Sequence, residues 1–352
     1  MAQAAQVATS GPADDPRPAL PGPYLLFLGD TVEDGFAKTA HGLADWAGER
    51  CIGELALPGA AVTTGLPRMN PAAAAAAGAR ALVIGVAARG GSIPPAWYAT
   101  LLAALEAGLD LVSGMHARLA EIDVLRAAAE RLGRRLIDVR VPPPGLAVAS
   151  GARRPGRRLL TVGTDCALGK KYTALAIARG LRERGIDASF RATGQTGIMI
   201  AGAGIPMDAV VSDFLAGAAE QLSPAATPDH LDVIEGQGSL FHPSYAAVSL
   251  GLLHGSQPDL FVVCHEPGRT VLLGSPDFQV PSIEAVIDLT IALGRLTNPH
   301  IRCVGISLNT GHVTATAAAA EIAATAARLG MPAADPIRGG PAFDDLLDAC
   351  MA

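Results

Sequence analysis

The chain has 352 residues, of which 50% are hydrophobic and 17% are charged, which is enough for two domains that each bury a core. Its 27 basic and 33 acidic residues give a net charge of -6. This balance argues against a general nucleic-acid binder but leaves small anionic ligands open. Only 4% of the residues are aromatic, so Ala, Val, Leu and Ile must build the cores.

The five cysteines are scattered, and none forms a C-x-x-C pair. This spacing argues against a disulfide framework or a zinc site, so we expect a reducing, cytoplasmic location and no bound metal. Residues 1–22 lack the basic start and the apolar segment of a signal peptide, and we expect them to form a disordered tail. Since no apolar run reaches transmembrane length, no membrane association is expected.

Strand and helix patterns alternate between residues 23 and 141, which predicts an α/β domain with a parallel, Rossmann-like sheet. The predicted strands cover residues 24–28, 50–55, 81–86, 110–113 and 136–140. The predicted helices cover residues 37–46, 72–77, 97–107 and 117–132. No G-x-G-x-x-G sequence follows the first strand, so dinucleotide binding is not supported in this domain.

Residues 142–157 are predicted to link this domain to a second one, at 158–352. Three consecutive prolines open this segment and prevent regular structure. Arg153, Arg154, Arg157 and Arg158 lie in it or directly after it. We interpret them as solvated linker charge, with help in holding an anion near the phosphate loop described next as the alternative.

Residues 159–179 read LLTVGTDCALGKKYTALAIAR, which predicts a strand at 159–162, a phosphate loop and a helical pattern from Thr173. Backbone N–H groups between Gly163 and Lys170 can point into one concavity, where the helix N-terminus and Lys170 add positive charge. The loop has five residues between its glycines instead of four. Lys171 stands where a Mg²⁺-binding hydroxyl is usual, and Thr173 cannot be assumed to replace it.

The loop is therefore predicted to bind a phosphorylated ligand, with Mg-ATP less certain than usual. The residues assigned to this site are Gly163, Thr164, Asp165, Cys166, Ala167, Leu168, Gly169, Lys170, Lys171, Tyr172 and Thr173.

After the loop, strands are predicted at 188–192, 231–234, 260–264, 302–308 and 332–337, and helices at 208–220, 283–296, 315–329 and from 342 onward. The strand ends deliver Glu235, His265 with Glu266, and Asn309. Because the carboxyl ends of parallel strands share one edge of a sheet, these side chains are expected to converge there. The glycine-rich stretch after residue 193 predicts close backbone packing around a ligand or a subunit partner.

The sequence GTDCALGK resembles the lengthened phosphate loop of dethiobiotin synthetase, and Glu235-Gly236 and the GISLN segment ending in Asn309 match its acidic loop and base-contacting Asn. A closer resemblance extends over nearly the whole chain. The strings GTDCALGKKYTAL, ATGQTGIMIAGAGIPMDAVVSDF, EGQGSLFHPSYAAVSLGLLHGSQPD and CHEPGR identify the chain as a member of the bacterial D-glutamate N-acetyltransferase family, formerly a domain of unknown function.

This resemblance implies a Rossmann-like N-terminal domain, a phosphate-loop C-terminal domain, and acetyl transfer from acetyl-CoA to the amine of D-glutamate or a related amino acid. The phosphates of acetyl-CoA would sit on residues 163–170. Acyl transfer needs a base, for which we favour Glu235 over its rivals His265, His242 and Glu266. It also needs oxyanion donors, for which the backbone of residues 236–239 or 194–197 is a candidate.

The remaining assignments concern the acceptor and a possible nucleophile. The candidate substrate-binding residues are Arg269, Glu266, Gln195 and Gly236, with Lys171 and Arg191 as further candidates for the substrate carboxylates. Cys166 lies near a helix N-terminus, where a thiol can be acidic and carry a covalent acetyl group. A small loop residue chosen for fit is the favoured interpretation of Cys166.

Two other functions stay open at this stage. The first is a Mg-ATP-dependent ligase or kinase of the dethiobiotin synthetase type, in which Asp165 and Glu235 would hold the metal. The second is a nucleotide-gated binding protein with no catalytic activity, against which the lack of a Cys/His cluster counts. The expected partners are a small amino acid and an acyl-CoA, with no nucleic acid, and a homo-oligomer is expected.

Overall fold

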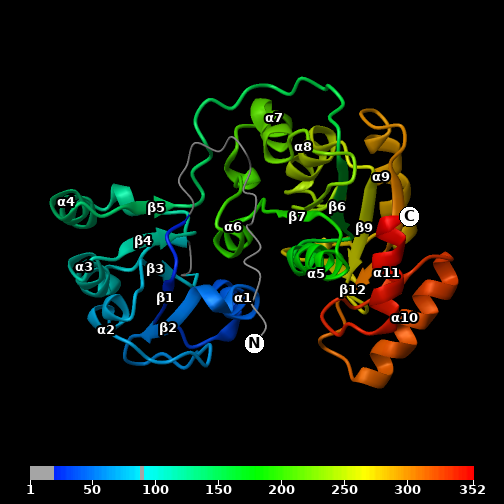
Figure 1. The fold of residues 1–352 in the computed structure, drawn as a ribbon. Helices are drawn as coiled ribbons and strands as arrows, with labels where there is room; N and C mark the ends of the chain where they lie inside the picture. Colours follow the sequence, from blue (N-terminus) through cyan, green and yellow to red (C-terminus); the bar gives the residue numbers. More distant parts are fainter. Residues whose placement is uncertain (1–19, 88–90) are drawn as a thin grey trace. The chain divides into compact units, whose positions relative to one another are not determined.

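The structure, a computed structural model, describes residues 20–87 and 91–352. It contains two compact units, each described by itself (Figure 1). The N-terminal unit comprises residues 20–142 together with Gln195–Ala209, and the phosphate-loop unit comprises Pro143–Gly194 and Val210–Ala352. Residues 1–19, which make up most of the predicted tail, lie outside the described residues.

The N-terminal unit is built on a five-stranded parallel sheet with the order β2-β1-β3-β4-β5. The strands are β1 (Tyr24–Gly29), β2 (Cys51–Ala56), β3 (Ala81–Ile84), β4 (Asp110–Ser113) and β5 (Leu136–Asp138). Its first four helices are α1 (Lys38–Trp46), α2 (Pro71–Ala76), α3 (Tyr98–Glu106) and α4 (Asp123–Leu132). Right-handed crossovers place α2, α3 and α4 on one face of the sheet and α1 on the other (Figure 1).

A fifth helix of this unit comes from far along the chain. Helix α6 (Gln195–Ala201) lies beside α1, and a short 3-10 helix (Met207–Ala209) belongs to the same unit, although the sequence assigned all of 158–352 to the second domain. The contacts are specific, because Arg50 donates to the carbonyl oxygen of Ile200 at 3.2 Å and Thr39 shares a hydrogen bond with Thr196 at 2.9 Å. The glycine-rich stretch therefore does pack closely, but against α1 and Arg50 of the N-terminal unit.

The phosphate-loop unit has a six-stranded parallel sheet with the order β13-β12-β9-β6-β8-β7. The strands are β6 (Arg157–Gly163), β7 (Ala188–Arg191), β8 (Leu231–Ile234), β9 (Leu260–His265), β12 (Arg302–Leu308) and β13 (Ala333–Ala334). Leu159, Val233 and Val262, from the central strands, form the buried core with α5. The main sheets of both units are parallel and covered by helices, so the predicted α/β class is confirmed.

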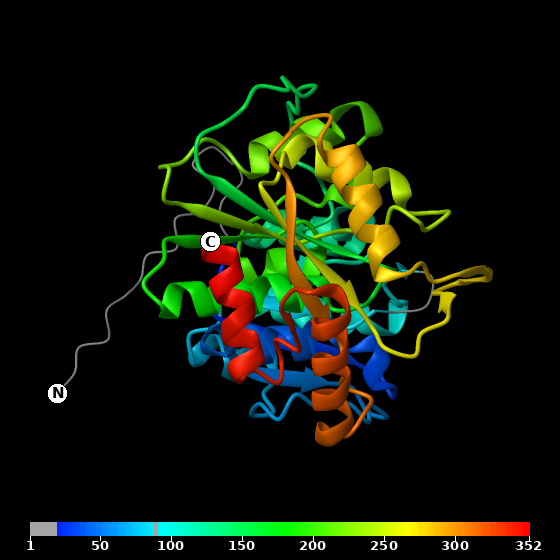
Figure 2. The same ribbon diagram turned by 90° about the vertical axis from the view of Figure 1, so that its right-hand side faces the viewer.

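The helices of this unit cover both faces of its sheet. They are α5 (Lys170–Glu183), α7 (Ser212–Leu222), α8 (Ala246–Ser256), α9 (Ile283–Gly294), α10 (Ala315–Leu329) and α11 (Pro341–Met351). Helices α5 and α11 pack together on one face, and α7, α8 and α9 cover the other (Figures 1 and 2). A small antiparallel hairpin, β10 (Val271–Leu272) with β11 (Ser275–Gln279), follows β9. This hairpin and α8 were not predicted from the sequence.

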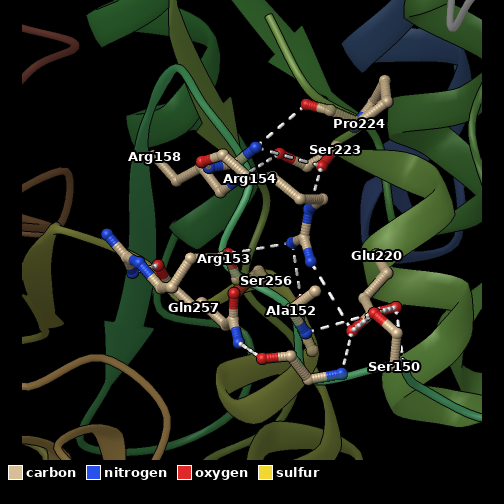
Figure 3. Close-up of polar contacts among 12 residues, drawn as sticks. Ser150, Ala152, Arg153, Arg154, Arg158, Glu220, Ser223, Pro224, Ser256 and Gln257 are labelled. Carbon is tan, nitrogen blue, oxygen red and sulfur yellow. Dashed lines mark hydrogen bonds and ion pairs between the residues drawn. The ribbon is translucent and has the colours of Figure 1, made fainter.

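Residues 143–156 contain no helix or strand, as the prolines predict, but they are not a free linker. Ser150 and Gly151 donate their N–H groups to the Glu220 carboxylate of α7 at 2.9 and 2.8 Å (Figure 3). A Cβ on Gly217 of α7 would lie 1.9 Å from the carbonyl oxygen of Ala147, so only glycine allows the segment to pass. These contacts fix the segment along the helix.

The four arginines of this region bond to other parts of the same unit, with Arg153 paired to Asp259 and Arg157 donating to the carbonyl oxygen of Met351, which corrects both interpretations made from the sequence. Arg158 is 2% exposed and donates to the Ser223 hydroxyl at 2.8 Å and to the carbonyl oxygen of Pro224 at 2.9 Å (Figure 3). Arg154 donates to the carbonyl oxygens of Ser223 and Gly255. The cluster gathers where β6 begins, about 20 Å along the strand from the phosphate loop, because strands rise about 3.3 Å per residue. It therefore cannot hold an anion there.

Candidate functional site

The phosphate loop connects β6 to α5, as predicted, although α5 begins at Lys170 and not at Thr173. Ala167 and Gly169 have positive φ angles of 53° and 101°, and such left-handed residues turn neighbouring N–H groups toward one concavity. The Lys170 ammonium is buried and donates to the carbonyl oxygen of Asp165 at 2.7 Å. Burial lowers the pKa of Lys170, and an anion bound beside it would oppose this shift by stabilising the ammonium form.

The strand register brings the predicted residues of β9 and β12 to the same edge of the sheet as the loop. Gly163 pairs with Cys264, and His265 pairs with Leu308. The Thr164 hydroxyl lies 3.0 Å from Nδ1 of His265. The N–H of Asn309 donates to the carbonyl oxygen of His265 at 2.8 Å, so the loop and the two strand ends are in contact.

Arg269 ties these strand ends to the loop. Its Nη1 lies 3.0 Å from Oδ2 of the fully buried Asp165 and donates to the carbonyl oxygen of Cys166 at 2.8 Å. Its Nη2 lies 2.7 Å from the Glu266 carboxylate, which also accepts a hydrogen bond of 3.4 Å from Asn309. Arg269 and Glu266, both predicted to bind substrate, are thus paired with each other and with the loop.

Glu235 lies just after β8 and is 5% exposed. One oxygen of its carboxylate, Oε2, accepts hydrogen bonds from the backbone N–H groups of Thr193 at 2.9 Å and Gly194 at 3.0 Å. Burial raises the pKa of Glu235, and the positive charge of Lys171 partly opposes this shift. A buried carboxylate with a raised pKa is suited to accept a proton near neutral pH.

Gly236 and His242 continue this loop, and their polar groups are engaged. A Cβ on Gly236 would lie 1.6 Å from the carbonyl oxygen of Thr161, and its N–H donates to the Thr161 hydroxyl at 2.9 Å. That N–H is therefore not available to an oxyanion. Nδ1 of His242 accepts from the N–H of Ser244 at 3.2 Å, so Nε2 carries the proton and donates to the carbonyl oxygen of Leu273 at 3.1 Å.

Asp165, Cys166 and His242 place their possible ligand atoms within 4.8 Å of one another, the one such metal-ligating group among the described residues. Both Asp165 oxygens accept N–H hydrogen bonds, from Cys166 on one side and from Arg269 and Leu273 on the other. Since both His242 nitrogens are engaged as well, a cation would have to replace these bonds. The donor set does not fit a metal in this conformation.

Two family models match the chain. A "Domain of unknown function (DUF1611_C) P-loop domain" matches residues 147–347, and a "Domain of unknown function (DUF1611_N) Rossmann-like domain" matches residues 55–142. The chain belongs to the DUF1611 family.

Two curated relatives of this DUF1611 chain carry the name D-glutamate N-acetyltransferase. The relative from Tritonibacter scottomollicae is 50% identical over 318 residues, and the one from Pseudoalteromonas sp is 46% identical over 318 residues; each alignment covers 90% of this chain and 96% of the relative. The crystal structure of a DUF1611 family protein from Anabaena variabilis is 36% identical, with a TM-score of 0.80 over 94% of this chain and 98% of that one. The resemblance stated from the sequence is thus confirmed.

Two side chains of the DUF1611 loop bear on the chemistry left open by the sequence. Burial raises the pKa of Cys166, the opposite of the acidic thiol that a covalent acetyl intermediate requires. The Thr173 hydroxyl is 2.7 Å from the hydroxyl of Ser307 and is buried, so it is directed into the sheet and away from the loop concavity. Thr173 therefore does not replace the Mg²⁺ ligand that is missing at Lys171.

The remaining candidates of the DUF1611 chain differ in their surroundings. Arg191 is 8% exposed and forms an ion pair of 2.6 Å with the buried Asp232, so it is not placed for a substrate carboxylate. Gln195 belongs to the N-terminal unit. Lys171 lies over the ring of Tyr172, 4.3 Å from its centroid. No helix in the described parts of the chain has both the length and the apolar character needed to cross a bilayer.

Two groups of this site were not predicted from the sequence. The N–H of Leu273 donates to Asp165 at 2.8 Å from the unpredicted hairpin, and the hydroxyl of Ser307 meets Thr173. Nothing in the sequence near Leu273 indicates this contact, because a backbone N–H group carries no residue signature. Ser307 precedes Asn309 by two residues on the predicted strand 302–308, so strand alternation could have placed both side chains on one face.

Proposed function

We propose that this chain is an N-acetyltransferase that transfers acetyl from acetyl-CoA to the amino group of D-glutamate. The observation that carries the proposal is the 50% and 46% identity, over 90% of the chain, to two relatives named for this activity. We also propose that the acceptor is D-glutamate, that the acyl donor is acetyl-CoA, and that the protein is a cytoplasmic homo-oligomer.

Acetyl-CoA fits the phosphate loop as a ligand because it joins a thioester to a phosphorylated nucleotide. The loop offers the left-handed backbone at Ala167 and Gly169 and the buried ammonium of Lys170. The Mg²⁺-binding hydroxyl is absent at Lys171, and the Thr173 hydroxyl is bonded to Ser307. These features support recognition of phosphates without a metal, and they count against the Mg-ATP ligase.

In the reaction, the amine nitrogen attacks the thioester carbon, the C–S bond breaks, and the CoA thiolate leaves and is protonated. The ammonium form of the amine must lose a proton first, and we assign this step to Glu235. Its Oε2 is held by two backbone N–H groups, and its raised pKa suits proton transfer. His265 is the alternative base, with a pKa that burial lowers; His242 and Glu266 are positioning residues.

The proposal is tested by free-thiol release from acetyl-CoA with the purified full-length chain and a panel of D- and L-amino acids. We expect release with D-glutamate and a product with the mass of N-acetyl-glutamate. Formation of ADP from Mg-ATP with an amino acid, without thiol release, would instead establish the ligase. No thiol release with any amine would overturn the acetyltransferase assignment.

A further inference from the structure

The N-terminal unit contains a cavity of about 490 Å³, within the size range of small-molecule sites. Its wall is formed by the ends of β3 and β4, by α1, and by the first residue of α6. The lining includes Thr39, Ile84, Gly91, His116, Arg140 and Gln195. The phosphate loop does not contribute to this wall, so the cavity is a second candidate site on the chain.

The cavity lies beyond the carboxyl ends of β3 and β4, beside the point where the strand order reverses. Strand β1 lies between β2 and β3 in the sheet, so the chain reverses direction across the sheet between β1 and β3. Ligands bind beyond the carboxyl ends of the strands at such a switch point. Ile84 ends β3, and Gly114 follows β4 directly, so the cavity opens at this edge.

Each polar side chain of the wall can donate a hydrogen bond. They are the guanidinium of Arg140, the side-chain amide of Gln195, the hydroxyl of Thr39 and the imidazole of His116, and the described residues of the lining include no Asp or Glu. Arg140 is anchored by Nε, which donates to the carbonyl oxygen of Gly114 at 2.7 Å, and by Nη1, which bonds to Asp208. These bonds use two of its three nitrogens. A guanidinium with amide and hydroxyl donors is suited to carboxylates.

Gln195 is held in the wall by the packing of α6. A Cβ on Gly114 would lie 3.0 Å from Cβ of Gln195, so a larger residue at 114 would push Gln195 away. The hydroxyls of Thr39 and Thr196 share a hydrogen bond, and Arg50 holds the carbonyl oxygen of Ile200. Helix α6, which is distant in sequence from the rest of this unit, thus places the amide of its first residue, Gln195, in the cavity wall.

A second glycine makes room for the imidazole in the same way. Gly91 has a φ of +68°, and a Cβ there would lie 2.7 Å from Cδ2 of His116. Ile84, Val86, Ala87 and Met115 supply the apolar part of the lining. The wall therefore combines a short apolar surface with several convergent donors, which matches a small anionic molecule with a short hydrocarbon chain.

We propose that this cavity binds the amino-acid acceptor, a small amino acid with two carboxylates, through Arg140 and Gln195. The inference rests on the proposed function and deepens it, because it separates an acceptor site in the N-terminal unit from the donor site at the phosphate loop. Arg140 pairs with one carboxylate. Gln195, with the Thr39 and His116 donors, binds the other carboxylate and fixes its distance from the first.

The test is isothermal titration calorimetry of D-glutamate onto the full-length chain saturated with CoA. CoA occupies the donor site but has no acetyl group to transfer, so binding is measured without turnover. Gln195→Glu adds a carboxylate to the wall, and Arg140→Gln removes the cation. Each is expected to raise the Kd of D-glutamate about tenfold or more, the usual cost of losing a hydrogen bond to a charged group. The Kd of CoA, measured separately, is expected to stay within about twofold in both variants.

Asp208→Asn is the matched control, because it removes the partner of Arg140 and keeps the cation. The Kd of D-glutamate is expected to stay the same or fall in this variant. If the ion pair only held the fold of the wall, the Kd would rise. D-glutamate binding at the parent Kd in both Gln195→Glu and Arg140→Gln would overturn the cavity assignment and leave the proposed function standing. Binding that needs both residues, without thiol release from acetyl-CoA, would overturn the proposed function and support the cavity.

Discussion

The ion pair between Arg269 and Asp165 joins two segments that are 104 residues apart in the sequence, at an Nη1–Oδ2 distance of 3.0 Å. Asp165 is fully buried in the phosphate loop, and Arg269 follows β9. A buried carboxylate needs a charged partner or several hydrogen bonds. Arg269 therefore fixes the loop conformation, whereas the sequence suggested that it binds a substrate carboxylate.

Arg269→Gln separates these two roles by steady-state kinetics. Loss of the ion pair loosens the phosphate loop, so we expect the KM for acetyl-CoA to rise about tenfold or more, with the KM for D-glutamate within about twofold of the parent. Arg295→Gln, at the exposed end of α9, is the control and is expected to change neither value. A rise confined to the KM for D-glutamate would show that Arg269 binds the substrate carboxylate.

The strands were the most predictable part of the fold. Residues 110–113, 231–234 and 302–308 were predicted with the bounds that β4, β8 and β12 show, because each is a short apolar run followed by polar or glycine residues. Helix α8 was missed because its apolar residues fall on all sides and leave no helical periodicity. The hairpin was missed because exposed residues make up most of β11.

The candidate site was predictable to the extent that strand ends fix it. Thr164, His265 and Asn309 meet because parallel strands share an edge, and this follows from the sequence. The partners of individual side chains do not follow. Nothing near Arg158 indicates that backbone carbonyl groups surround it, and nothing near Gln195 indicates that its helix belongs to the N-terminal unit, because both depend on residues distant in the chain.

Lys170→Met tests whether the loop binds the phosphates of the acyl donor. The substitution removes the buried ammonium and keeps an unbranched side chain of similar length. We expect the Kd of acetyl-CoA to rise about tenfold or more, while the Kd of acetyl-pantetheine, which has no phosphate, stays unchanged. Equal losses for both ligands would show that Lys170 supports the fold of the site; no loss for acetyl-CoA would place its phosphates elsewhere.

Glu235→Gln tests the assignment of the base. The amide oxygen can still accept the Thr193 and Gly194 hydrogen bonds, so the fold should persist, but the side chain can no longer take a proton. We expect kcat to fall about 10²- to 10⁴-fold, the range for general base catalysis. The carboxyl must be ionised to act, and its pKa is raised by burial, so parent activity should increase with pH above the usual 4.5.

The pH profile supplies the control for Glu235. Ionisation of the substrate amine affects parent and variant alike. Only the difference between their pH profiles therefore reports the ionisation of the Glu235 carboxyl. That difference should vanish at low pH, where Glu235 is protonated in the parent. A Glu235→Gln variant with parent kcat and profile would exclude Glu235 as the base. In that case we expect the fall in kcat in His265→Gln.

His230 predicts how stability depends on pH. Its Nε2 lies 3.0 Å from the buried Asp232 and its Nδ1 lies 2.8 Å from Asp187, and its hydrogen bond to Asp232 raises its pKa above the usual 6.5. The folded state thus favours the protonated ring, so the stabilisation is complete below pH 6.5 and is lost as the pH rises through the folded-state pKa. His230→Gln cannot be protonated and should lower the free energy of unfolding by about 1.5 kcal/mol at pH 5.5, and by less at pH 9.

Urea unfolding of the parent and His230→Gln between pH 5.5 and 9 measures this difference. His300→Gln, at an exposed residue outside this cluster, serves as the matched control for replacing a histidine by glutamine. A deficit in His230→Gln that is constant with pH would mean that His230 contributes by packing alone, because a neutral ring loses no charge when the pH rises. A deficit that grows toward pH 9 would contradict the protonated state, since it would require the folded chain to bind fewer protons than the unfolded one.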